Sequence, residues 1–458
     1  MSARTWHRKA SKPVSIWMWV FILIGLTHTL FPEPSWLLIH IFTLGIVANS
    51  IVLWSVNLTE RFLQHRLPEE ARPAQLWRTW VLNAGVVLVL VGQVLASWWE
   101  QHWLVTWVGG CLVAGAVLWH AVVLARLVRD TGPEKRHRPA AIGYVASAAC
   151  LLAGVCFGAA LSMGLPGTWQ EQIRQAHLFT NVGGFVGLAA MSSLSVLFPT
   201  MWRINGMRDR TRAAIWGAVA GIVCAVVGAL LGISQVVAVG AFVYVGAWLW
   251  LFQGFLVNVI DVLRDPRDRI TYPGLSVFVA MFWLIGTMLW YAVGLVRTVP
   301  QIPTLALLLG FVAPLLIGTM SYLLPTTMGG GPKAVRAGLL ELSRGTYFRV
   351  VLYNLALTVW LVTEQSWLRV VMSLLVFAVL VAYLPLLRRA VKAQVAVRRG
   401  QREAPVAGAH VERPLAGKWP SNLRRGRPKG RPAASPCRGA HVGRPLAGEW
   451  SGNLRRGR

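Results

Sequence analysis

The strongest constraint on this chain is a long series of apolar segments, each about 20 residues in length. An α-helix of that length crosses the hydrocarbon core of a bilayer. Lipid offers the backbone no hydrogen-bond partner, so a spanning segment must be a helix or a strand of a closed barrel. Barrel strands alternate polar and apolar residues, and that alternation is absent here. The sequence therefore predicts an all-α polytopic membrane protein.

Twelve segments fit this description. They are residues 15–31, 36–57, 79–97, 103–126, 140–163, 175–200, 213–233, 236–261, 273–296, 303–325, 349–364 and 367–387. Together they define a membrane domain at 15–390, between an N-terminal segment at 1–14 and a tail at 391–458. The composition agrees, because 14% of the residues are charged, whereas soluble domains carry about 25%.

The loops between the predicted spans alternate in charge. Basic residues fill residues 58–78, 127–139, 201–212, 262–272 and 326–348, and the first of these loops includes Arg72 and Arg78. The opposite loops, such as 98–102 and 365–366, are nearly bare. Because cytoplasmic loops are enriched in Lys and Arg, we predict that the basic loops and both termini are cytoplasmic, in the plasma membrane. The net charge of +28 then needs no nucleic-acid partner.

An internal repeat is visible within the predicted membrane domain. The second span contains HIFT at 40–43, and the sixth contains HLFT at 177–180. The sixth closes with VLFPTM at 196–201, and the tenth with YLLPTTM at 322–328. These spans are four helices apart, which favours three pseudo-repeats of four helices.

The tail differs from the membrane domain in kind. Residues 408–427 recur at 439–458 with few changes. A duplication rich in Arg, Gly and Pro cannot build a core, so we expect the tail to be disordered. Anionic lipid headgroups are its expected partner, and an extension without any role is the alternative.

Four histidines lie in the predicted spans: His28, His40, His120 and His177. All but His120 fall within about 10 Å of the predicted outer boundary. Imidazole ligates metals and the iron of haem. We predict that His40 and His177, at matching repeat positions, face one cavity and hold a haem or metal. His28 and His120 are further candidates, and boundary residues without a ligand are the alternative.

Two arginines near the predicted outer boundary could pair with haem propionates, because a guanidinium suits bidentate contact with a carboxylate. They are Arg174, one turn before His177, and Arg369, at the start of the last span. Snorkelling of these side chains to the interface is the alternative reading.

The helix number, the repeat and the outer histidines together resemble the catalytic subunit of haem–copper oxidases over about residues 1–390. The segments SWLLIH (35–40), QAHL (175–178) and GTMSYLLP (318–325), followed by GGGP (329–332), are similar to divergent twelve-helix members. These are the NnrS-like proteins and the membrane module of actinobacterial proteins labelled copper oxidases. The resemblance implies haem. The oxidases need histidines in spans seven and ten, but no histidine occurs between His177 and His410, so we expect neither copper nor oxygen reduction.

Three functions stay open at this point. The first is a haem- or metal-binding membrane protein with a redox or nitric-oxide-related role and a redox or membrane-protein partner. The second is a non-catalytic membrane partner or assembly protein without cofactor. The third is a small-molecule transporter. Proton-coupled transport is disfavoured, because carboxylates such as Asp261 and Glu364 occur only at span ends. We expect the first function.

Overall fold

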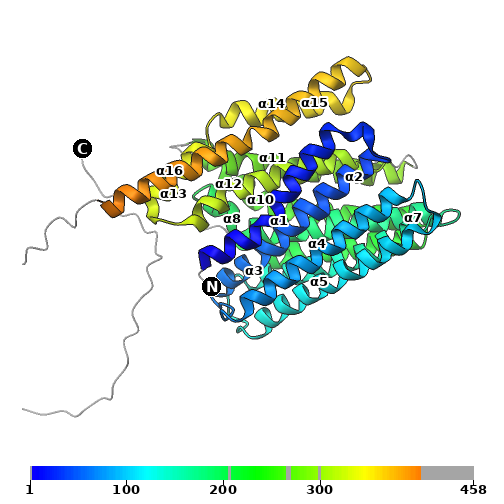
Figure 1. Ribbon diagram of the computed structural model, residues 1–458, viewed down its shortest axis with the longest axis horizontal. Helices are drawn as coiled ribbons and strands as arrows, with labels where there is room; N and C mark the ends of the chain where they lie inside the picture. Colours follow the sequence, from blue (N-terminus) through cyan, green and yellow to red (C-terminus); the bar gives the residue numbers. More distant parts are fainter. Residues whose placement is uncertain (1–2, 205–207, 265–269, 298–300, 404–458) are drawn as a thin grey trace, which may run out of the picture. The chain divides into compact units, whose positions relative to one another are not determined.

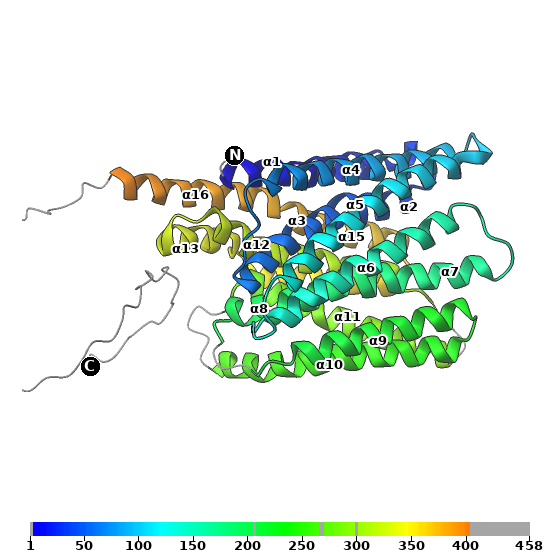
Figure 2. The same cartoon turned by 90° about the horizontal axis from the view of Figure 1, so that it is seen from below.

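The protein is described by a computed structural model that covers residues 3–204, 208–264, 270–297 and 301–403. Every regular element in these ranges is a helix, which confirms the predicted all-α membrane fold. Eleven helices there are long and apolar enough to cross a membrane, and a bent pair of helices makes a twelfth. Figure 1 and Figure 2 show these helices running side by side along one direction.

The first six spans alternate in direction along the chain. They are α1 (Ala3–Leu26), α2–η2–α3 (Pro34–His40, Ile41–Ala48, Asn49–Leu63), α4 (Ala71–Leu95), α5 (Trp103–Arg129), α6 (Arg138–Leu161) and α7–η4–α8 (Trp169–Leu178, Phe179–Gly187, Leu188–Met201). Two short 3₁₀ turns, η1 (His28–Leu30) and η3 (Glu100–His102), lie in loops at one end of the bundle. We call that end the histidine end, because His40 and His177 lie near it.

The remaining spans complete the bundle. They are α9 (Thr211–Leu230), α10 (Ser234–Arg264), α11 (Tyr272–Val296), η5–α12 (Ala306–Val312, Ala313–Met328), the bent pair α13 and α14 (Gly331–Leu342, Thr346–Val362), and α15–α16 (Ser366–Val381, Tyr383–Glu403). The start of α1 and the end of α16 lie at the same end of the bundle (Figure 1). That arrangement agrees with an even number of crossings.

Several helices extend past the predicted ends of their spans. The second span ends at Leu63 and α4 begins at Ala71, so Glu60 and Arg78 are helical and buried rather than in a loop. The spans were predicted from uninterrupted apolar residues, so each predicted span ends at the first charged residue. The helix itself continues where a partner or a packed surface accepts that charge. The same applies at the two ends of the chain, where α1 begins at Ala3 and α16 reaches Glu403. The rest of the predicted tail, with its duplication and its expected lipid contact, lies outside the described residues.

Spans two, six and ten share an unusual feature, since each contains a π-helical segment. These segments are η2, η4 and η5. A π-helix carries one extra residue per turn and occurs mostly as a single turn at functional sites. The same three spans carry the matching sequence motifs. The π-helical segments are therefore one more feature that recurs at the four-helix spacing of the predicted repeat.

A second repeated feature links the first and third sets of helices. Each set has a tryptophan in one span, a glycine in the π-helical segment of the next, and an asparagine in the span after it. The sets are Trp17, Gly45 and Asn83, and Trp283, Gly310 and Asn354. In both, the indole packs on the glycine, where a Cβ would collide with the ring. In both, the indole N–H donates to the asparagine Oδ1 at 2.6 Å. The two sets are eight spans apart.

Helices α4 and α5 approach each other closely through small residues. A Cβ on Gly92 would lie 2.7 Å from the backbone nitrogen of Thr106, and a Cβ on Gly85 would lie 2.8 Å from that of Val113. Small residues drive helix association in membranes, because lipid supplies no hydrophobic force between helices. These two contacts set the antiparallel register of the pair.

Candidate functional site

His40 is the last residue of α2, directly before the π-helical segment η2. Its ring stacks on Trp36, one turn earlier, with 3.8 Å between the ring centroids. Its Nδ1 lies 2.8 Å from the Trp36 carbonyl oxygen. A carbonyl oxygen only accepts hydrogen bonds, so Nδ1 carries the proton and Nε2 keeps its lone pair. Local helix contacts thus fix both the ring position and the tautomer.

His177 lies in α7, two residues before the π-helical segment η4. Its Nδ1 lies 2.9 Å from the Gly154 carbonyl oxygen on α6, which leaves the lone pair on Nε2 here as well. Gly158, one turn further along α6, would bring a Cβ to 2.9 Å from the imidazole Cε1. The glycine therefore makes room for the ring. Asn181 lies 3.1 Å from Nδ1 and donates to the His177 carbonyl oxygen at 2.8 Å.

The structure brings His40 and His177 together. Their ring centroids are 6.5 Å apart and the ring planes make an angle of 33°. Both residues line one cavity of about 550 Å³ between spans two to six and span ten. Neither Nε2 has a hydrogen-bond partner among the described residues. Two unprotonated ring nitrogens from two spans are therefore available to a ligand in one cavity.

The walls of this cavity are mainly apolar, with a few polar groups. Besides the two histidines, the polar side chains are Thr43, Gln93, Thr106, Ser162, Gln170, Arg174, Asn181 and Thr304. Arg174 is exposed and forms an ion pair with Glu171 one turn earlier. Cofactor pockets commonly measure about 300–1,000 Å³ and combine apolar walls with a few placed polar groups. The cavity has that size and that character.

The other predicted site residues lie elsewhere. His28 is exposed in η1, where its Nδ1 contacts the Gly25 carbonyl oxygen at 2.9 Å. His120 is buried in α5 and its Nε2 lies 3.0 Å from Ser55 Oγ. Arg369 is exposed and covers the Trp360 ring at 5.5 Å. None of the three lines the cavity of His40 and His177.

The sequence reading did not identify the residues that support the two rings. Trp36 has a local signal, because it stands one turn before His40 and residues four apart share a helix face. Gly154 and Gly158 have none, because their role depends on how α6 packs on α7. At the corresponding place in span ten, Thr304 lines the cavity instead of a histidine, two residues before η5.

The donor set suits haem better than a free metal ion. Protein metal sites use three or four ligands, and the described residues contain no group of three or more His, Cys, Asp or Glu that could hold one. Haem needs only axial ligands from the protein, since its macrocycle supplies the others. Two imidazoles that each place a nitrogen about 2 Å from one ion have ring centres about 6 Å apart. The observed 6.5 Å fits that requirement.

Neither family models nor curated proteins assign this chain to a family. No protein-family model matches it. No curated protein matches it either. The candidate site is therefore defined by its own geometry, namely two neighbouring imidazoles that line one cavity at the histidine end of the bundle.

Proposed function

We propose that this protein binds haem in the cavity at the histidine end, where His40 and His177 would hold it. One observation carries the proposal: the two ring centroids lie 6.5 Å apart and both residues line one cavity of about 550 Å³. The resemblance to the haem–copper oxidase scaffold points the same way. We further propose that the protein resides in the plasma membrane.

The surroundings of both histidines support ligation. A metal-ligating imidazole almost always donates its second nitrogen to a carbonyl or carboxylate, which orients the ring and raises its basicity. Trp36 O and Gly154 O take that place here. Stacking on Trp36 restricts the rotation of the His40 ring. Arg174, which lines the cavity, is positioned to meet a propionate.

The two histidines favour a redox role. Haem held by His40 and His177 would supply one-electron transfer. The exposed Arg174 marks the histidine end as the side from which a redox partner would approach.

The test is an absorbance spectrum of the purified protein in detergent, oxidised and reduced. We expect a Soret band that shifts on reduction. His40→Ala and His177→Ala should each lose at least half of the bound haem or convert it to a five-coordinate spectrum. His28→Ala is the matched control, because His28 is exposed outside the cavity, and it should keep the wild-type spectrum.

Two results would contradict the proposal. One is wild-type protein that binds no haem even when haem is supplied during expression. The other is a Soret band that both cavity variants retain unchanged. A folded protein without haem would favour the non-catalytic membrane partner.

A further inference from the structure

A buried arginine inside the third span has no partner. Arg78 lies two turns into α4, and only 3% of its surface is exposed. It forms no ion pair or hydrogen bond with any residue that the structure describes, and its Nε is fully buried. Long basic side chains near a helix end usually reach water by snorkelling, and the low exposure excludes that here. A buried charge without a counter-charge is strongly unfavourable.

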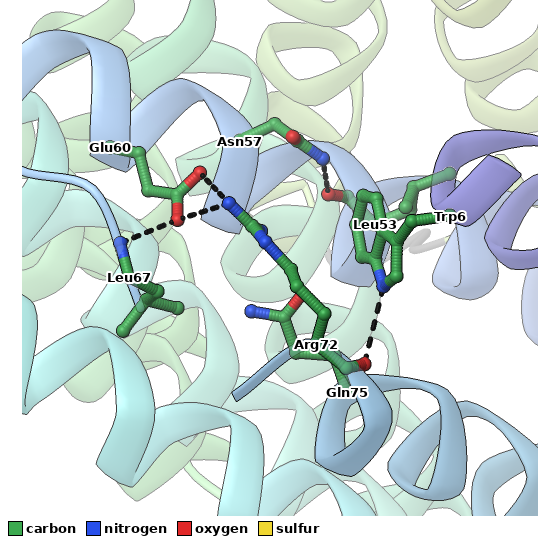
Figure 3. A network of polar contacts seen from close by, with 7 residues as sticks. All are labelled: Trp6, Leu53, Asn57, Glu60, Leu67, Arg72 and Gln75. Atoms are coloured by element: carbon green, nitrogen blue, oxygen red, sulfur yellow. Dashed lines mark hydrogen bonds and ion pairs between the residues drawn. The ribbon is translucent and has the colours of Figure 1, made fainter. Parts of the chain in front are cut away.

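Helices α3, α4 and α5 carry a single carboxylate, Glu60, and it is already paired. Glu60 accepts from Arg72 Nη2 through both of its oxygens, at 2.9 and 3.1 Å, and from the Leu67 backbone nitrogen at 2.9 Å. Figure 3 shows this network, with the Arg72 side chain extended toward Glu60 and beside Gln75. Glu60 therefore neutralises Arg72, and the charge of Arg78 remains.

The register of α4 against α5 brings His120 opposite Arg78. Gly92 lies against Thr106 and Gly85 lies against Val113, so seven residues along α4 correspond to seven residues along α5. Seven residues make about two helical turns. One further step of seven pairs Arg78 with His120.

The groups around Arg78 are hydrogen-bond donors without acceptors. His120 Nδ1, Gln75 Nε2 and Thr59 Oγ1 are all buried and have no partner among the described residues. Ser55 Oγ lies 3.0 Å from His120 Nε2. In the tautomer in which Ser55 donates to Nε2, His120 Nδ1 carries the proton and is free to donate. Thr59 and Gln75 lie one turn from Ser55 and Arg78 on the same helix faces. Such groups are rarely left unpaired in a protein interior.

We propose that Arg78 and His120 form the centre of a buried site for a small monovalent inorganic anion between α3, α4 and α5. One permanent positive charge matches one negative charge. Arg78 and His120 are only 3% and 2% exposed, which excludes a large organic anion or a lipid headgroup. The neighbouring donors of Thr59 and Gln75 complete the shell that a desolvated anion requires.

The test compares thermal unfolding of the purified protein in sodium chloride and in sodium gluconate at equal ionic strength. Binding to the folded state raises Tm by mass action, and a rise on the order of 5 °C is expected at a chloride concentration 100-fold above Kd. Arg78→Met should abolish the chloride response, with a Tm in gluconate at or above that of the wild type. Arg126→Met, at an exposed position of α5, is the matched control and should respond as the wild type does.

A second measurement is independent of any variant. Crystals of the wild-type protein grown in sodium bromide should show an anomalous bromide peak within hydrogen-bond distance of the Arg78 guanidinium. The proposal is overturned if this peak is absent, if the wild-type Tm is the same in both salts, or if Arg78→Met keeps the chloride response.

Discussion

Charged residues inside the bundle follow different rules from charged residues at its surface. Glu60 and Arg72 form an ion pair whose side chains are 8% and 19% exposed. Asp261 and Arg264 form a pair on α10 whose side chains are 66% and 76% exposed. The Coulomb attraction is stronger where water is excluded, and so is the cost of losing one partner. Two pairs of the same chemistry should therefore respond differently to substitution.

We expect Glu60→Gln to lower the free energy of unfolding by about 3 kcal/mol, because it leaves Arg72 without its counter-charge and replaces one of the two acceptor oxygens by an NH2 donor. Asp261→Asn removes the exposed pair and should cost less than about 1 kcal/mol. Denaturant or thermal unfolding in detergent measures both. Equal losses in the two variants would refute the burial argument. In the double variant Glu60→Gln/Arg72→Met, part of the loss should be recovered, because the uncompensated charge is gone.

The sequence predicts only part of the candidate site, and individual residues show why. His40 and His177 were predicted to meet because matching motifs put them at equivalent depths in two spans. Glu60 and Arg78 were assigned to a loop, because an apolar run ends at the first charge. The carbonyl of Gly154 and the space left by Gly158 depend on the packing of α6 on α7, which no local pattern encodes.

At the scale of the helix, glycine decides how closely two spans pack. A Cβ on Gly85 would lie 2.7 Å from the Gly109 carbonyl oxygen and 2.8 Å from the Val113 backbone nitrogen. Those atoms belong to the backbone of α5, so they cannot move aside as a side chain would. Gly115 lies on the same helix as this contact surface, but a Cβ there would meet nothing within 4 Å. Substitution of Gly85 therefore tests helix packing, whereas substitution of Gly115 tests helix propensity alone.

Gly85→Ala should lower the free energy of unfolding by about 1–3 kcal/mol, because α4 and α5 must move apart to admit the methyl group. Gly115→Ala should be neutral or stabilise by up to about 1 kcal/mol, because alanine is the better helix former. Thermal unfolding of the two variants in one detergent gives the comparison. If the substitutions had the same effect, the close approach of α4 and α5 would be wrong.

At the scale of the whole molecule, the number of crossings depends on the bent pair. Helix α13 meets α14 at 40°, with the break at Ser343–Gly345. Helix α14 has 17 residues, about 25 Å at the helical rise. It packs along α15 and shares with it a small core of Tyr353, Ala356, Leu357, Val376 and Val379, as the neighbouring labels in Figure 1 show. If α15 crosses the membrane, α14 therefore crosses beside it, which gives twelve spans.

Cysteine labelling tests this number and the predicted orientation together. Single cysteines are placed at exposed loop positions, in a chain whose own five cysteines are replaced by serine. Gln101 and Gln365 are exposed at the histidine end, and Glu134 and Lys333 at the opposite end. Because the basic loops should be cytoplasmic, a membrane-impermeant maleimide should label Gln101→Cys and Gln365→Cys in intact cells. Glu134→Cys and Lys333→Cys should react only after permeabilisation.

The labelling pattern distinguishes a wrong orientation from a wrong number of spans. A complete reversal of the labelling pattern would keep the twelve spans and invert the predicted orientation. Labelling of Gln101→Cys but not of Gln365→Cys in intact cells would give an odd number of crossings between them, and α14 would then not cross. That result would also move the start of α15 to the end of the bundle where α1 begins, against its packing along α14. The experiment therefore tests the positive-inside argument and the α14–α15 packing with the same four variants.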